Sequence, residues 1–166
     1  MLLWFVGTSV VTIWYVFRDP GFDYRLLIVG SILPPLIDVW FGGARVMYSL
    51  TASVALLAAV MVVTVGRRRL RRSLLGLPLG TFLHLVFSGA WSDSSVFWWP
   101  FSGGFDDAPL PFEGRGWWNA VLEVAGVALV GWIVGRTDLR RREARHRFVR
   151  TGALRLDGRV LHDRRA

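Results

Sequence analysis

The sequence predicts an all-α, polytopic membrane protein, a bundle of about five transmembrane helices, and two observations carry this prediction. Hydrophobic residues make up 53% of the 166-residue chain, and the mean hydropathy is +0.42. A soluble domain of this size needs more polar residues to cover its surface. The hydrophobic residues also form long runs instead of the one-sided pattern of a water-facing helix, which indicates burial in lipid.

The hydrophobic runs define the expected spans, which are residues 1–17, 26–41, 46–66, 73–91 and 117–135. The first run lacks the basic start and the small-residue cleavage site of a signal peptide, so we expect it to be retained. The second contains Pro34 and Pro35. Because proline removes a backbone donor and disfavours helix in the residue before it, we expect this second helix to be kinked or broken.

The arginines predict the orientation in the inner (plasma) membrane. All 20 basic residues are arginine; five lie within residues 67–72 and eleven follow Gly135. Because basic loops stay in the cytoplasm, we expect a cytoplasmic C-terminus, with the N-terminus and the loop at 92–116 outside. The net charge of +8 by itself would allow a nucleic-acid partner, but arginines that flank apolar spans argue against one.

A basic cytoplasmic tail, residues 136–166, is expected to follow a transmembrane bundle of residues 1–135. Residues 136–150 are predicted to form an amphipathic helix at the anionic inner leaflet, where each arginine contributes about 1 kcal/mol. Asp157-Gly158 predicts the turn of a short hairpin, and a partly disordered tail is the alternative. The expected partners are membrane lipids and a protein partner bound through this tail.

Three ionisable residues lie inside predicted spans: Asp38, His84 and Glu123. Each costs roughly 2.5–3.5 kcal/mol to insert, which marks it as a functional or partnered group. They lie on different helices and can converge, and carboxylates and imidazole are ligands for zinc or another divalent metal. A proton relay, a buried hydrogen-bonded cluster, or helix ends that reach water are the alternatives. Cysteine-based zinc sites and disulfides are excluded, because the chain has no cysteine.

Two stretches of the chain match motifs of a known family. Gly30-Ser31-Ile32-Leu33-Pro34-Pro35-Leu36-Ile37-Asp38 is similar to a G-x-x-L-P-D-x-x-D element. Leu83-His84-Leu85-Val86-Phe87-Ser88, followed by Phe97-Trp98-Trp99-Pro100-Phe101, is similar to an H-x-x-x-D helix and a W-P-F segment. The predicted bundle thereby resembles the membrane-bound metal-dependent hydrolases of the YdjM type, whose actinobacterial members are small multi-span proteins.

The resemblance implies a hydrolase with catalytic His84 and Asp38 and a divalent metal, zinc or manganese, held by these two residues. Glu123, which is not part of the motifs, would supply the third ligand that a catalytic zinc needs. Such a metal would lower the pKa of a bound water and polarise the ester of a lipid-linked or envelope substrate. The chain departs from the motifs at three positions: it has Pro35, Tyr48 and Ser88 where the family has Asp, His and Asp.

Two function hypotheses therefore stay open. One is a hydrolase that works with the remaining ligands. The other is a non-catalytic membrane protein that has kept the fold, has lost the activity, and binds lipid or a partner subunit of an envelope complex.

Overall fold

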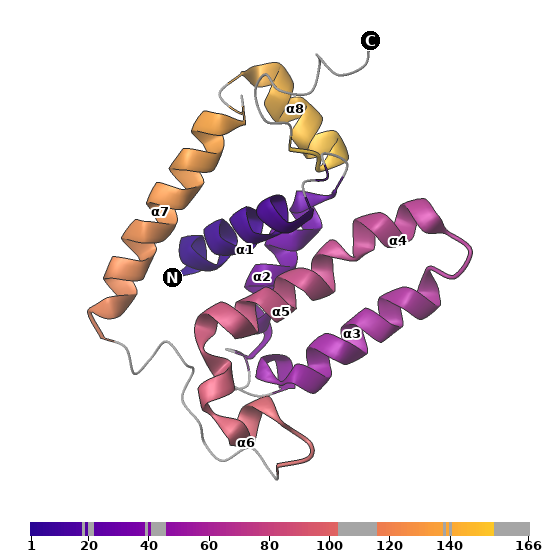
Figure 1. The fold of residues 1–166 in the computed structure, drawn as a ribbon, viewed down its shortest axis with the longest axis vertical. Helices are drawn as coiled ribbons and strands as arrows, with labels where there is room; N and C mark the ends of the chain where they lie inside the picture. Colours follow the sequence, from indigo (N-terminus) through magenta and orange to yellow (C-terminus); the bar gives the residue numbers. More distant parts are fainter. Residues whose placement is uncertain are drawn as a thin grey trace.

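The computed structural model describes residues 1–17, 19, 22–38, 40, 46–102, 116–137, 139 and 141–154, and within them every regular element is helical (Figure 1). The elements are α1 (Leu2–Phe17), α2 (Tyr24–Asp38), η2 (Val46–Tyr48), α3 (Leu50–Val63), α4 (Arg68–Leu74), α5 (Gly76–Ser88), η3 (Ala90–Ser92), α6 (Ser94–Phe97), α7 (Trp118–Arg136) and α8 (Arg142–Thr151). The all-α prediction is confirmed for this part of the chain.

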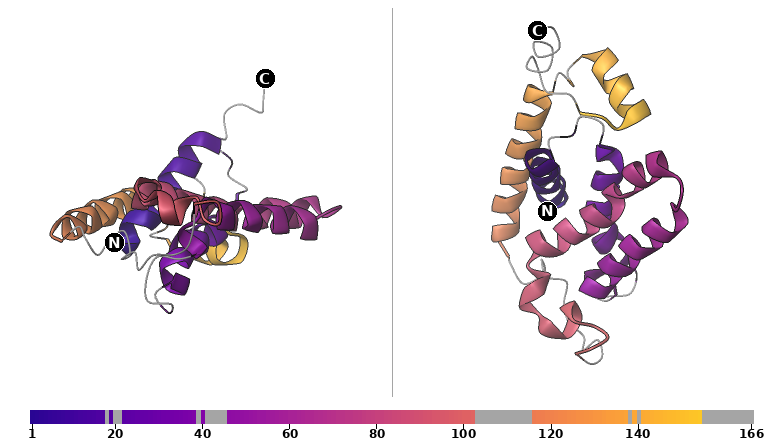
Figure 2. Two further views of the ribbon diagram at one scale, coloured as in Figure 1. Left: turned by 90° about the horizontal axis from the view of Figure 1, so that it is seen from below. Right: turned by 45° about the vertical axis from the view of Figure 1, so that its right-hand side comes forward.

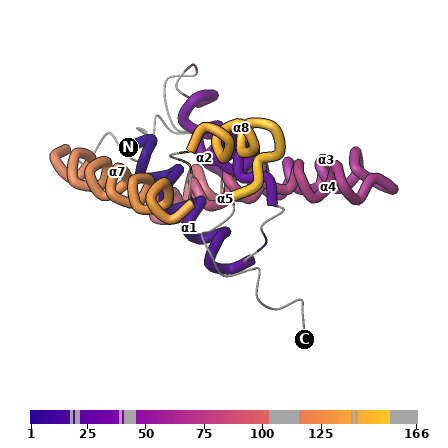
Figure 3. Tube along the Cα trace, turned by 90° about the horizontal axis from the view of Figure 1, so that it is seen from above, coloured from indigo at the N-terminus to yellow at the C-terminus, as the bar shows by residue number. Residues whose placement is uncertain are grey.

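The centre of the molecule is formed by α1, α2 and α5. α2 packs mainly against α5, and α1 contacts α2 and α5 as well as α7. Figure 2 shows α7 on one flank of α1 and the antiparallel pair of α3 and α4–α5 on the opposite flank. α8 lies beside the start of α2, because the amide of Tyr24 donates to the carbonyl oxygen of Gly152 at 3.0 Å. In Figure 3, seen from above, α8 lies in front of α2.

One described helix, α7, is long and apolar enough to cross a membrane; α1 and α3 are apolar but shorter. α7 coincides with the last predicted span and ends at Arg136, one residue beyond the predicted limit of the bundle. The predicted tail helix at 136–150 is accordingly divided. Its beginning belongs to α7, and its remainder forms α8 after a short connection. The predicted hairpin at 154–161 lies, apart from its first residue, outside the described residues.

Small residues allow α2 and α5 to cross with their backbones in contact. Gly76 and Gly80, four residues apart, lie on the face of α5 that meets α2. A Cβ atom at Gly76 would lie 2.9 Å from the carbonyl oxygen of Asp23, and one at Gly80 would collide with the backbone of Leu27. The same spacing continues to His84, one turn further on, so its ring is also carried against α2.

Of the two outcomes expected for the second helix, kinked or broken, the break is wrong, because α2 continues through Pro34 and Pro35 to Asp38. In a regular helix the amide of residue 34 bonds the carbonyl of Gly30, and that of residue 35 bonds the carbonyl of Ser31. Proline has no such amide. The missing donors are replaced by side chains of α5, and their geometry defines the site described next.

Candidate functional site

His84 occupies a fully buried position in the middle of α5, with no exposed surface. Its Nδ1 lies 2.7 Å from the carbonyl oxygen of Ser31, and its Nε2 lies 3.1 Å from the hydroxyl oxygen of Tyr48. A carbonyl oxygen only accepts hydrogen bonds, so Nδ1 carries the proton. Nε2 of the neutral ring therefore accepts the Tyr48 O–H. Both ring nitrogens are engaged, and the Phe5 ring covers the imidazole at a centroid distance of 4.0 Å.

His84 and Thr81 replace the two donors that the prolines remove from α2. Thr81 Oγ1 lies 3.2 Å from the carbonyl oxygen of Gly30, the acceptor left by Pro34, and 3.1 Å from that of Leu77 on its own helix, so the two carbonyls share its single proton. The Nδ1–H of His84 donates to Ser31, the acceptor left by Pro35. Proline is tolerated inside membrane helices when a neighbouring helix satisfies the released carbonyl in this way. His84 thus compensates for the amide hydrogen that Pro35 lacks.

Tyr48 is placed by the start of α3. The next residue, Ser49, caps this helix by accepting the amide of Ala52 at 3.1 Å, which fixes the end of the preceding η2 turn. The Tyr48 side chain is fully buried and packs with Leu85 and Val96, while its ring meets that of His84 edge to face at 5.4 Å. The residue that departs from the hydrolase motif at this position therefore fills the space beside the imidazole and hydrogen-bonds to it.

Asp38 is the last residue of α2 and is 1% exposed. It lies two helical turns beyond Ser31, on the same face of the helix. The hydrogen bonds of His84 go to Ser31 and Tyr48 and not to Asp38. The two predicted catalytic residues are thus both buried where α2 meets its neighbours, without a direct bond between them.

Glu123 lies apart from this cluster, on α7 where that helix meets α1. Its carboxylate oxygens accept the amide of Leu3 at 3.4 Å and pair with the amino group of Met1 at 3.0 Å. α1 stands between the two sites, since its Phe5 side chain faces His84. In the described part of the chain, no three histidine, aspartate or glutamate side chains lie together as ligands of one metal ion. Asp38, His84 and Glu123 in this arrangement do not fit a shared metal, and the metal site stays a prediction.

A second buried polar cluster, which the sequence analysis did not single out, joins the tail to the bundle at Asp23. The carboxylate, 7% exposed, accepts Arg25 Nε at 3.1 Å, Arg25 Nη2 at 2.9 Å and Ser73 Oγ at 2.6 Å. Burial by itself raises the pKa of Asp23. The hydrogen bonds from Arg25 and Ser73 and the charge of Arg25 outweigh burial, so this pKa lies below its usual value of 3.8.

The same cluster holds the end of α8. Arg25 Nη1 donates to the carbonyl oxygen of Val149 at 2.5 Å, and the amide of Tyr24 donates to that of Gly152 at 3.0 Å. Gly152 has a φ of +68°, and a Cβ atom there would collide with the Asp23 carboxylate. Just beyond it, Leu154 is 6% exposed and belongs to the core. Two features of the sequence could have pointed to this cluster. Asp23 is an acidic residue between two aromatic residues just before a predicted span, and Gly152 follows the predicted basic helix.

Comparisons with protein-family models, curated proteins and solved structures find no match for this chain. The likeness to the hydrolases therefore rests on the motif residues alone.

Proposed function

We propose that the chain is a multi-pass protein of the inner (plasma) membrane, in which α1, α2, α3 and α5 lie in the bilayer beside α7. The placement of polar and apolar side chains supports this. Val62 on α3 and Val124 on α7 are 71% and 69% exposed, whereas Ser9, Thr81 and His84 are fully buried. A protein surrounded by water rarely exposes large contiguous apolar patches. Lipid around the bundle accounts for the reverse arrangement.

Among the described helices, α7 alone is long enough to cross a bilayer without adjustment. The 19 residues of α7 rise about 28 Å at 1.5 Å per residue, close to a hydrocarbon core of about 30 Å. The 16 residues of α1 and the 14 of α3 rise only about 24 and 21 Å. Shorter spans are accommodated by local thinning of the bilayer and by flanking side chains that reach the interface.

Cysteine labelling tests this topology, because the chain has no native cysteine. Single cysteines are introduced at Arg69 and at Ser102, two exposed positions that precede α7 in the chain. If only α7 crosses the membrane, both label from the same side. We expect Ser102→Cys to react with an impermeant maleimide in intact cells, and Arg69→Cys to react only after permeabilisation. Equal labelling of the two positions would contradict the multi-pass proposal.

Within this bundle, we infer that His84 has a structural role and that the protein is non-catalytic. The observation that carries the inference is the engagement of both ring nitrogens, at 2.7 Å by Ser31 and at 3.1 Å by Tyr48. A histidine that binds a metal needs a free lone pair on one nitrogen, and here the Nε2 lone pair accepts Tyr48. Pro35 and Tyr48 stand where the hydrolase motifs have Asp and His, and in this chain both are partners of His84. The protein then acts by binding lipid or a partner subunit of an envelope complex, with α8 as its basic cytoplasmic element.

The hydrolase is the second candidate, and the burial of Asp38 at 1% exposure favours it. A carboxylate inside a span is costly and marks a functional site more often than a packing residue. This candidate requires Tyr48 to leave Nε2 free for a metal.

Metal content separates the two candidates. The full chain, purified from cells supplied with zinc and manganese, is expected to hold far less than one ion per molecule, and the value should not change in Tyr48→Phe or Asp38→Asn. A triple variant, Pro35→Asp with Tyr48→His and Ser88→Asp, restores the ligands of the motifs and serves as the comparison. Stoichiometric metal in the native chain that is lost in His84→Gln would favour the hydrolase and overturn the structural role.

A further inference from the structure

We propose that the segment from Ala90 to Ser102, which contains η3 and α6, is an interfacial anchor that lies among the lipid headgroups of the outer leaflet. The exposed rings of Trp91, Trp98 and Phe101 are its lipid-facing groups. Its partner is the lipid surface itself. The proposal rests on the multi-pass membrane function and names a part of the chain that contacts lipid outside the spans.

The aromatic rings of this segment are open to the surroundings of the protein. Phe101 is 86% exposed, Trp91 64% and Trp98 52%. Trp117 and Trp118, which stack on each other at a centroid distance of 4.4 Å where α7 begins, are also more than half exposed. Tryptophan combines an apolar ring with a polar N–H group, and it is enriched at the boundary between hydrocarbon and water for that reason.

The segment is fixed to the bundle, so its exposed rings are held outside the core. Val96 on α6 is 2% exposed and packs with Tyr48 and Leu85. Thr51 Oγ1 on α3 donates to the carbonyl oxygen of Trp99 at 2.6 Å. One side of the segment is thereby occupied by the bundle, and the other side presents its rings to whatever surrounds the protein.

The distribution of charge places the segment at the outer end of the protein. The chain has no arginine between Arg72 and Arg115, as expected of a segment outside the cell. The single charged residue of the segment, Asp93, caps α6 by accepting the amide of Ser95 at 3.1 Å. α6 and the arginine-rich α8 lie at opposite ends of the molecule (Figure 1). The 13 residues of α5 rise only about 20 Å, so anchoring side chains just beyond its end suit a short span.

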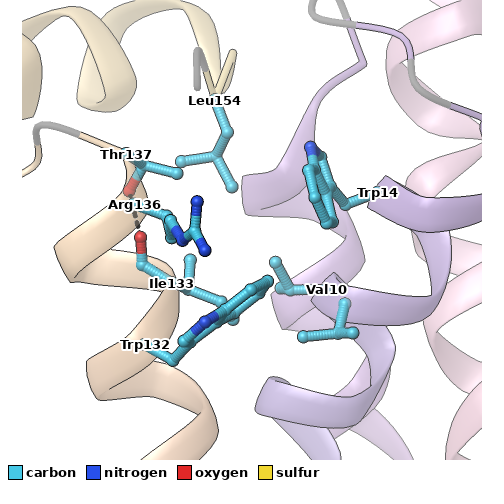
Figure 4. A pocket seen from close by; sticks show the side chains of 8 residues that line it. Val10, Trp14, Trp132, Ile133, Arg136, Thr137 and Leu154 are labelled. Atoms are coloured by element: carbon cyan, nitrogen blue, oxygen red, sulfur yellow. Dashed lines mark hydrogen bonds between the residues drawn. The ribbon is translucent and has the colours of Figure 1, made fainter. Parts of the chain in front are cut away.

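The aromatic residues at the end near α8 differ in having a cation beside them. Trp132 meets Trp14 edge to face at a centroid distance of 5.9 Å, and the guanidinium carbon of Arg136 lies 5.6 Å from the centroid of the Trp132 ring (Figure 4). An arginine at this place suits the anionic inner leaflet. The segment at 90–102 contains no arginine, so its contact with lipid does not depend on the charge of the headgroup.

The test uses the full-length protein with a nitrobenzoxadiazole label on Phe101→Cys, reconstituted into phosphatidylcholine vesicles, so that an aromatic label replaces the exposed ring. A nitroxide on the lipid headgroup should quench the label more strongly than a nitroxide in the middle of the acyl chain or iodide on both sides of the membrane. Addition of phosphatidylglycerol should not change this order. Glu143→Cys, at an exposed position on α8, is the matched control and should be quenched most strongly by iodide.

Ring variants test whether the aromatic side chains hold the segment at this depth. Trp91→Ser with Trp98→Ser, made in the Phe101→Cys protein, should weaken quenching by the headgroup nitroxide and strengthen quenching by iodide. Phe17→Ser removes a ring that is 53% exposed and stacks on Phe22, far from this segment in the chain, and it should change neither. If the double variant does not fold, Trp91→Ser alone decides, because its ring is the more exposed of the two.

The proposal is overturned if the label at position 101 behaves like the label at position 143, if the nitroxide in the acyl chain quenches it most, if the order requires phosphatidylglycerol, or if the tryptophan variants act like Phe17→Ser. None of these results alters the side from which Arg69→Cys and Ser102→Cys react. Equal labelling of those two cysteines would contradict the multi-pass function at any depth of the label, so the two failures are distinguishable.

Discussion

Replacement of Pro35 by alanine should make His84 largely dispensable for stability. In the native chain the Nδ1–H of His84 is the donor to the Ser31 carbonyl, at 2.7 Å, since residue 35 has no amide hydrogen. His84→Leu removes this donor inside the buried bundle and leaves the carbonyl without one. In a Pro35→Ala background the amide of residue 35 supplies the ordinary helical hydrogen bond. The same histidine substitution then leaves no orphaned carbonyl on α2.

The magnitude follows from the cost of an unsatisfied buried polar group, about 1–3 kcal/mol. Double-mutant cycles inside a membrane protein give smaller couplings, on average about 0.6 and at most about 1.7 kcal/mol. We therefore expect a coupling of about 1–2 kcal/mol between positions 35 and 84. Loss of the hydrogen bond to Tyr48 and of the ring packing is common to both backgrounds and cancels from the cycle.

The assay is reversible unfolding in mixtures of dodecyl sulfate and a neutral detergent, followed by the far-ultraviolet circular dichroism of the helices. The four proteins needed are the native chain, Pro35→Ala, His84→Leu and the double variant. Thr81→Val combined with Pro35→Ala is the control, because Thr81 donates to the Gly30 carbonyl, which belongs to Pro34. That pair should be additive within about 0.5 kcal/mol.

Equal costs of His84→Leu in the two backgrounds would refute the pairing of His84 with Pro35. A cost confined to the loss of bound metal, with no change in unfolding, would refute it as well and would return His84 to the hydrolase hypothesis.

The remaining predictions concern Tyr48 and the tail. Tyr48→Phe should destabilise the bundle by about 1–2 kcal/mol in the same unfolding assay, because it leaves Nε2 of the buried imidazole unsatisfied. Gly152→Ala should release α8 and speed tryptic cleavage there, whereas Gly66→Ala, with a φ of +77° but no neighbouring atom within 4 Å, should not. The depressed pKa of Asp23 means that its contribution is complete above its usual pKa of 3.8 and is lost as the pH falls through the lower folded value. A spin label on the exposed face of α8 should therefore become mobile only in this acidic range.

Helix positions were predictable from the chain because hydrophobic runs bounded by arginine, proline and glycine are local features. α1, α3 and α5 lie within predicted runs, and α7 exceeds its predicted run by one residue. The continuity of α2 was not predictable in this way. The rule that proline interrupts a helix considers only donors within the same segment, and here Thr81 and His84 supply them from another helix.

The candidate site divides along the same line. Asp38, His84 and Glu123 could be picked out because an ionisable group in an apolar run is a local anomaly. Their roles depended on partners that no local pattern shows: Glu123 faces α1 and the start of the chain, while His84 faces Ser31, 53 positions away. The cluster at Asp23 was missed because its acceptors and donors come from α2, α4 and the end of α8.

Residue order alone predicts that this chain is helical, and it shows that long apolar runs alternate with charge gathered at segments 67–72 and 136–166. Packing in three dimensions decides which buried polar side chains donate hydrogen bonds to backbone carbonyls of another helix, as His84 does, and which lie away from this cluster, as Glu123 does. The physical reason is that hydropathy and charge are properties of single residues summed over a short window. A hydrogen bond is a property of two atoms, and in this bundle the second atom lies on a different helix.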